Sequence, residues 1–144
     1  METQTYANHR RIVIPFHRVL LPILLLTVIG SLVNLYQSWG DHERIYNSSL
    51  IVVLSIAVQA VAIFARVFAL KAQDRAIRAE ESLRHFVLTG KLPDARLTVL
   101  QIAALRFASD GEFVALAKKA AEEGMAPDAI KRAVQQWRAD TYRA

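Results

Sequence analysis

Two long stretches without a charged side chain lie close together in the first half of the chain. From residue 19 to residue 40, and again from residue 45 to residue 65, the sequence contains no Asp, Glu, Lys or Arg. About 20 apolar residues of α-helix cross the hydrocarbon core of a bilayer. Only Asp41-His42-Glu43-Arg44 separates the two stretches. The sequence therefore predicts two transmembrane helices in an antiparallel hairpin, because so short a connection keeps them side by side.

Basic side chains are concentrated on the outer sides of these two stretches. They are Arg10, Arg11 and Arg18 before the first stretch, and Lys71, Arg75 and Arg78 after the second. Because segments rich in Lys and Arg stay in the cytoplasm, we expect both termini on the cytoplasmic side of the membrane. We interpret the first stretch as a retained span, since it is longer than the roughly 7 to 15 apolar residues of a signal peptide.

The composition supports a membrane protein and excludes several kinds of chemistry. Hydrophobic residues make up 53% of the chain and the mean hydropathy is +0.22, which is too apolar for an ordinary soluble domain. The chain has no cysteine, which excludes disulfides, thiol chemistry and cysteine-based zinc sites. The histidines are scattered, and neither a glycine-rich phosphate loop nor a Gly-x-Ser-x-Gly motif is present. We therefore expect no catalytic residue, no metal site, no cofactor and no enzymatic activity.

A polar stripe runs along the two predicted spans. Its members are Thr27, Ser31, Asn34, Ser48, Ser55, Gln59 and Arg66. If the hairpin folds about residue 43, residues equally far from that point lie at equal depth, which matches Ser31 with Ser55 and Thr27 with Gln59. Small and polar residues in a membrane commonly pack helices together and hydrogen-bond between them, and we favour this interpretation. The alternative is a water-lined path for ions or a small solute.

The second span is predicted to continue as a helix beyond the membrane. Neither Pro nor Gly occurs from residue 48 to residue 86, so one helix is expected to run into the cytoplasm until Gly90. Residues spaced as the two core positions of a heptad form a small-residue seam along it. This seam comprises Ser55, Ala62, Ala65, Ala69, Ala72, Ala76 and Ala79. Alanine at such positions lets two helices approach closely, so the seam predicts either self-association or packing within the chain.

The remaining residues predict a small helical bundle. After the break at Pro93, we expect a helix capped by Asp94, a second that starts with a Ser109/Glu112 capping box and ends at Gly124, and a third from Pro127. The third helix would place Ile130, Ala133, Val134 and Trp137 on one apolar face, opposite Lys131, Arg132, Gln135 and Arg138.

A helix-turn-helix-like spacing in this region would offer the basic face of the third helix to a DNA groove. Residues 71–144 contain 13 basic and 10 acidic side chains, which is too balanced for a strong electrostatic footprint. Binding to nucleic acid is therefore the third and weakest hypothesis.

Short strings spread over the chain resemble a family of small bacterial inner-membrane proteins classed as a domain of unknown function. The strings are residues 65–78, His9-Arg10-Arg11, Leu105-Arg106-Phe107-Ala108-Ser109-Asp110 and Trp137-Arg138-Ala139-Asp140. The resemblance implies a two-span membrane protein with a helical cytoplasmic tail, and it implies no activity. It also directs attention to charged residues, and on physical grounds an ion-pair cluster of Asp74, Arg78, Arg106 and Asp110 would dock the tail onto the long helix.

Together these patterns predict an all-α membrane protein with a two-helix transmembrane hairpin, a second helix extended into the cytoplasm and a small three-helix cytoplasmic bundle. The expected segments are a basic N-terminal segment 1–18, the hairpin 19–70, the helical extension 71–90 and the tail 91–144. The leading hypothesis is a non-enzymatic, self-associating or accessory subunit of a membrane complex, with lipid, copies of itself or other membrane subunits as partners. The alternative is a homo-oligomeric channel or small-solute pore lined by the second transmembrane helix.

Overall fold

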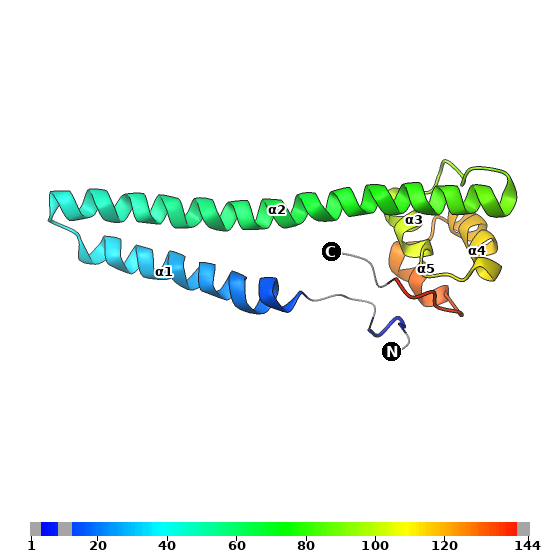
Figure 1. Cartoon of the computed structure of the whole chain (residues 1–144), viewed down its shortest axis with the longest axis horizontal. Coiled ribbons are helices and arrows are strands. Elements are labelled where there is room, and N and C mark those ends of the chain that lie inside the picture. Colours follow the sequence, from blue (N-terminus) through cyan, green and yellow to red (C-terminus); the bar gives the residue numbers. More distant parts are fainter. Residues whose placement is uncertain (1–3, 9–12, 141–144) are drawn as a thin grey trace. The chain divides into compact units, whose positions relative to one another are not determined.

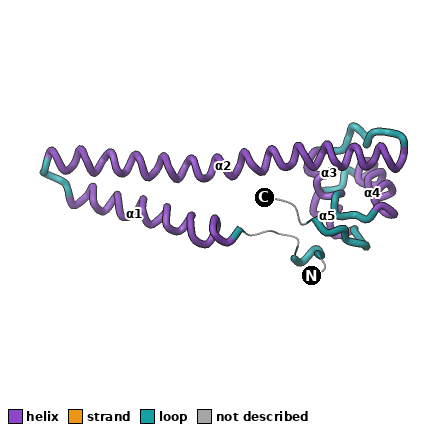
Figure 2. Tube along the Cα trace, viewed as in Figure 1, coloured by secondary structure: helices purple, strands orange, loops and turns teal. Residues whose placement is uncertain are grey.

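The computed structural model of the chain describes residues 4–8 and 13–140, which contain five α-helices and one short π-helix (Figures 1 and 2). The elements are η1 Pro15–Leu20, α1 Leu21–Gln37, α2 His42–Thr89, α3 Val99–Leu105, α4 Asp110–Glu123 and α5 Pro127–Ala133. No strand is present within the described ranges apart from an isolated bridge, so the all-helical prediction is confirmed for them.

Two compact units share helix α2. The hairpin unit covers Ile12–Phe68, and the tail unit combines Met1–Arg11 with Ala69–Ala144. The first half of α2 therefore belongs to the hairpin unit, whereas its last turns form part of the tail unit.

Both helices of the hairpin unit have the length and composition of membrane spans. Pro15–Gln37 and the apolar part of His42–Thr89 reach mean hydropathies of 2.2 and 2.4 over 18 residues. Large apolar side chains on their outer surfaces are exposed, including Leu26 and Val53. Two helices long and apolar enough to cross a bilayer are thus present, as the uncharged stretches predict.

A π-helical turn precedes α1 because of a proline. Pro22 lies in the first turn of α1, where it has no N–H to donate, and a proline ring clashes with the carbonyl four residues earlier. In the preceding π-helix the backbone N–H of Leu21 donates to the carbonyl of Phe16, five residues back. We attribute this wider turn to the space that the ring of Pro22 requires.

Polar side chains of the predicted stripe join α1 to α2. The hydroxyls of Ser31 and Ser55 lie 3.1 Å apart, and those of Ser38 and Ser48 lie 2.8 Å apart. The amide of Asn34 donates to the Ser48 hydroxyl at 3.1 Å. Ser31 with Ser55, as the sequence predicts, and Ser38 with Ser48 lie equally far from residue 43, whereas Asn34 with Ser48 does not. The hydroxyl of Thr27 instead donates to the Ile23 carbonyl of its own helix.

Replacing Ser48 with alanine is expected to weaken the hairpin by about 1 kcal/mol, since interhelical hydrogen bonds in membranes average about 0.6 kcal/mol and Ser48 makes two. The measurement is resistance of the purified protein to denaturation by SDS in mild detergent. Ser49→Ala is the matched control, because the Ser49 hydroxyl bonds only to the Tyr46 carbonyl of its own helix. Equal resistance of both variants would contradict this account of the interface.

The tail unit has a conventional hydrophobic core. Phe107, Phe113, Leu105 and Ile130 are its largest fully buried side chains. On α2, Ile77 and Glu81 are buried within the same unit, so one side of the last turns of α2 is covered by the bundle.

The start of α3 differs from the prediction. Helix α3 begins after Thr98, whose hydroxyl accepts the N–H of Gln101, while the Gln101 side chain accepts the N–H of Thr98. Asp94 is not the helix cap, because its carboxylate is held by the backbone N–H and the guanidinium of Arg96. These hydrogen bonds from Arg96 lower the pKa of Asp94 to about 2.

Helix α4 starts and ends where the sequence predicts. Ser109 is its N-cap, and the Glu112 carboxylate accepts the Ser109 N–H at 3.3 Å as in a capping box. Gly124 closes the helix with φ of 61°, a left-handed conformation that favours glycine.

The prediction for the third helix was wrong at its C-terminal end. Helix α5 stops at Ala133, Val134 is extended, and Trp137 pairs with Ala108 in an isolated antiparallel bridge. The Glu112 carboxylate accepts the N–H groups of Gln135 and Gln136, both at 3.0 Å. Those two donors are therefore unavailable for another helical turn. We call the extended segment 134–140 the C-terminal strap.

Candidate interaction site

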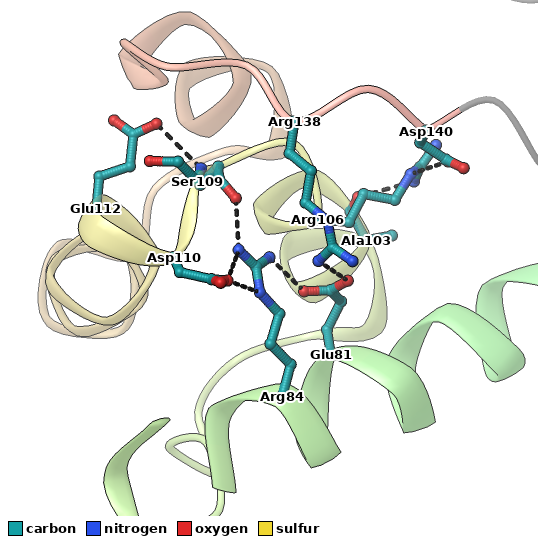
Figure 3. Close-up of polar contacts among 10 residues, drawn as sticks. Glu81, Arg84, Ala103, Arg106, Ser109, Asp110, Glu112, Arg138 and Asp140 are labelled. Atoms are coloured by element: carbon teal, nitrogen blue, oxygen red, sulfur yellow. Dashed lines mark hydrogen bonds and ion pairs between the residues drawn. The ribbon is translucent and has the colours of Figure 1, made fainter. Parts of the chain in front are cut away.

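A largely buried arginine, Arg84, links α2 to the tail helices (Figure 3). Arg84 donates from Nε to Asp110 Oδ1 at 2.7 Å, from Nη1 to Glu81 Oε2 at 2.9 Å and from Nη2 to the Ala108 carbonyl at 2.8 Å. Its guanidinium also lies 4.4 Å from the centre of the Phe113 ring. The Arg84 side chain is only 11% exposed, so one side chain satisfies acceptors from α2, α4 and the turn before α4.

The strap carries two further arginine contacts. Arg138 approaches the second oxygen of Glu81 at 3.9 Å, as Figure 3 shows. Arg106 donates to Asp140 Oδ2 and to the Ala103 carbonyl, both at 2.7 Å. Its guanidinium also covers the Phe107 ring. Ionic contacts thus bind the strap to both α2 and the end of α3.

The four residues of the predicted ion-pair cluster do not form it. Asp110 pairs with Arg84, and Arg106 pairs with Asp140. Within residues 4–8 and 13–140, no ion pair involves Asp74 or Arg78. The tail is docked onto α2 by charges, as the sequence suggests, but through Glu81 and Arg84. Glu81 and Arg84 are three residues apart on α2.

A small polar cavity of about 100 Å³ adjoins this network. Arg106 and Arg138 line it, together with the carboxylates of Glu80, Glu81 and Asp140. Arg106 is paired with Asp140 and Arg138 with Glu81, so the cavity offers no uncompensated positive charge to an anion. Across the described part of the chain, no group of three or more metal-ligating side chains is present.

Residues near the N-terminus pack onto the tail, a contact that the sequence does not signal. The Tyr6 hydroxyl donates to Asp128 Oδ1 at 2.8 Å and accepts from Arg132 Nε at 3.1 Å. The Gln4 side chain accepts the backbone N–H of Asp140 at 2.7 Å. We call residues 4–8 the N-terminal arm. The arm is part of the tail unit.

Replacing Tyr6 with phenylalanine is expected to raise the pKa of Asp128. The hydrogen bond from the Tyr6 hydroxyl is the main cause that lowers this pKa below its usual 3.8, with the positive charge of Arg132 adding to it. The measurement is the titration of the Asp128 carboxyl carbon by NMR, with Tyr46→Phe as a control outside the tail unit. An unchanged pKa in Tyr6→Phe would show that the arm does not dock as described.

Most residues of the polar stripe form hydrogen bonds between the two helices of the hairpin. Ser31, Ser48 and Ser55 are buried and hydrogen-bonded across the α1–α2 contact. Gln59 and Arg66 differ, because Oε1 of Gln59 and Nε of Arg66 are buried without a hydrogen-bond partner in the described residues. The stripe thus ends in two polar groups that the hairpin leaves unsatisfied.

Some residues of the small-residue seam are buried or half-buried, and the others are exposed. Ser55 is buried and Ala62 is half-buried, whereas the seam residues from Ala65 onward are exposed. In the tail unit the exposed positions continue with large side chains. They form a set that we call the stalk face, which consists of Ala69, Ala72, Ala76, Ala79, Leu83 and Phe86. Leu83 is 63% and Phe86 50% exposed, and the neighbouring Val87 is 74% exposed.

The whole chain, residues 1–144, matches the model of a family of unknown function, DUF6526. No curated protein matches the sequence, and no solved structure matches it.

Proposed function

The chain belongs to this family of unknown function, and we propose from its own geometry that it is a non-enzymatic integral membrane protein. It would serve as a self-associating or accessory subunit of a membrane complex. The observation that carries this proposal is the exposed apolar surface formed by Leu83, Phe86 and Val87. Contiguous exposed apolar side chains on a folded unit are typical of protein–protein contact sites.

These side chains are too far from the apolar part of α2 to be covered by lipid. The apolar stretch ends at Leu70, and Leu83 follows 13 residues later in the same helix. At 1.5 Å per residue this is about 20 Å along the helix axis, beyond the hydrocarbon core. Lys71, Asp74, Arg75 and Arg78 lie between the two positions and require water or head groups. Leu83 and its neighbours are therefore available to another protein.

We place both ends of the chain on the cytoplasmic side of a bacterial inner membrane. The basic residues outside the two apolar helices support this orientation, as does the acidic balance of the connection between them.

The proposal is tested by purifying the protein from native membranes in mild detergent or nanodiscs, then determining the mass of the complex and the identity of every chain. We expect either several copies of this chain or a stoichiometric foreign subunit. Val87→Asp is expected to dissociate that complex, whereas Leu100→Asp, which changes an exposed residue on α3, is expected to leave it intact. A wild-type monomer without a partner would overturn the proposal.

A channel is the second candidate, and the unsatisfied polar atoms of Gln59 and Arg66 favour it. Buried polar groups without partners are costly in a bilayer and often mark ion or solute paths. The hydrogen bonds of Ser48 and Ser55 to α1 count against a pore lined by the full stripe. Ion flux through reconstituted protein that disappears in Gln59→Leu would establish this function, and absence of flux would exclude it.

DNA binding receives little support from the tail. The helix that would enter a groove ends at Ala133, so Gln135 and Arg138 are not on it. Arg132 is engaged with Asp128 and Tyr6, and Arg138 faces Glu81.

A further inference from the structure

The stalk face has the spacing of a coiled-coil core. Its members alternate at intervals of three and four residues over three heptads, and all six are exposed. The other side of the same helix segment carries Ile77 and Glu81, which the chain's own tail covers. One side of this helix is thus packed against the chain's own tail, whereas no described residue of the chain packs over the stalk face.

The charges beside the stalk face favour a second copy of the same helix. With Ala76 and Ala79 at the two core positions, Arg75 and Glu80 occupy the flanking positions that meet between parallel helices. In a parallel pair of identical helices, Arg75 of each copy therefore faces Glu80 of the other. Both side chains are exposed, and no ion pair in the described ranges includes either of them.

The orientation of such a pair follows from membrane insertion. Two copies with the same topology in one bilayer have their α2 helices pointing in the same direction, so they meet in parallel. The antiparallel arrangement would place like-charged flanking residues opposite each other. Insertion and charge pattern therefore select the same arrangement.

We propose that the stalk face binds the stalk face of a second copy of this chain, as a short parallel coiled coil held by Leu83 and Phe86 and aligned by Arg75–Glu80 pairs between copies. Alanine at the preceding positions allows the helices to approach closely near the membrane. This inference rests on the proposed function as an interaction subunit, and it identifies the partner.

Cysteine crosslinking tests the contact directly, since the chain has no native cysteine. Ala76→Cys and Ala79→Cys lie on the stalk face, whereas Arg78→Cys lies in the same helical turn and faces away from it. In native membranes under mild oxidation, we expect disulfide-linked dimers of the first two variants and little of the third. Equal crosslinking of all three would indicate random collision and overturn the proposal.

A charge exchange tests the alignment. Arg75→Glu places like charges opposite each other, so we expect a several-fold loss of crosslinked dimer in the Ala76→Cys background. Adding Glu80→Arg restores opposite charges and is expected to restore the dimer. Loss in the single variant without recovery in the double variant would overturn the pairing of Arg75 with Glu80. Both residues are exposed, and an unchanged protease digestion pattern would verify that the tail unit remains folded.

The outcomes separate this inference from the proposed function. In one outcome the protein purifies with a stoichiometric foreign chain, and Ala76→Cys crosslinks to that chain and not to a second copy. This outcome would overturn the proposed homodimer, but it would support the proposed function as an interaction subunit. A monomer without any partner would overturn both.

Discussion

Replacing Arg84 with methionine is expected to lower the free energy of unfolding of the tail unit by about 3–5 kcal/mol, the usual cost of removing one partner from a buried ion pair. The reason is the environment of Glu81, whose side chain is 8% exposed and whose strongest contact is the Arg84 guanidinium. The variant also removes the donor to the Ala108 carbonyl. Loss of the contact with Asp110 matters less, because that carboxylate is 69% exposed and returns to water.

Chemical denaturation in mild detergent, followed by protease sensitivity of the strap, measures this effect. Arg96→Met is the matched control, since it removes an exposed arginine paired with exposed Asp94 and is expected to cost less than about 1 kcal/mol. Adding Glu81→Leu to Arg84→Met is expected to recover much of the lost stability, because it removes a buried carboxylate that would keep only the 3.9 Å contact with Arg138. Equal stability of Arg84→Met and Arg96→Met would contradict the role assigned to the buried pair.

Replacing Phe107 with alanine is expected to have an effect of similar size, about 3–5 kcal/mol, as for other fully buried aromatic side chains. The Phe107 ring lies 4.9 Å from the Trp137 ring and 4.3 Å from the Arg106 guanidinium. Its removal would leave a cavity under the strap, so we expect the strap to detach before the helices unfold.

Fluorescence of Trp137 in a Trp39→Phe background reports on the strap alone, because the chain has two tryptophans. Phe107→Ala is expected to give emission typical of solvent-exposed tryptophan at lower denaturant than the parent. Leu92→Ala changes an exposed side chain and is expected to alter stability by no more than about 0.5 kcal/mol. If the two variants shift the transition equally, Phe107 is not the support of the strap.

Local patterns in the sequence predicted the parts of the molecule that depend on neighbours along the chain. The length of the two uncharged stretches predicts the two apolar helices. The four-residue connection between them predicts that Ser31 and Ser55 lie at the same depth. The capping box at Ser109 and the left-handed Gly124 follow from the requirements of helix ends.

Contacts between distant segments were not predictable in the same way. The carboxylate of Glu112 accepts backbone donors 23 and 24 residues away, and this competes with the helical periodicity that suggested Trp137 on a helix. The partners of Arg84 were not predictable, because several carboxylates along the chain are equally plausible until the bundle is packed. Docking of Tyr6 onto Asp128 spans 122 residues, and no local pattern encodes it.

The hydrogen bonds of the N-terminal arm also determine the parity of membrane crossings. The arm and the tail belong to one folded unit, so Tyr6 and Asp128 must share one aqueous compartment. The chain between them can therefore cross a bilayer only an even number of times. A single crossing would place Tyr6 and Asp128 on opposite sides of the bilayer. If either apolar helix crosses a bilayer, the other must cross it as well.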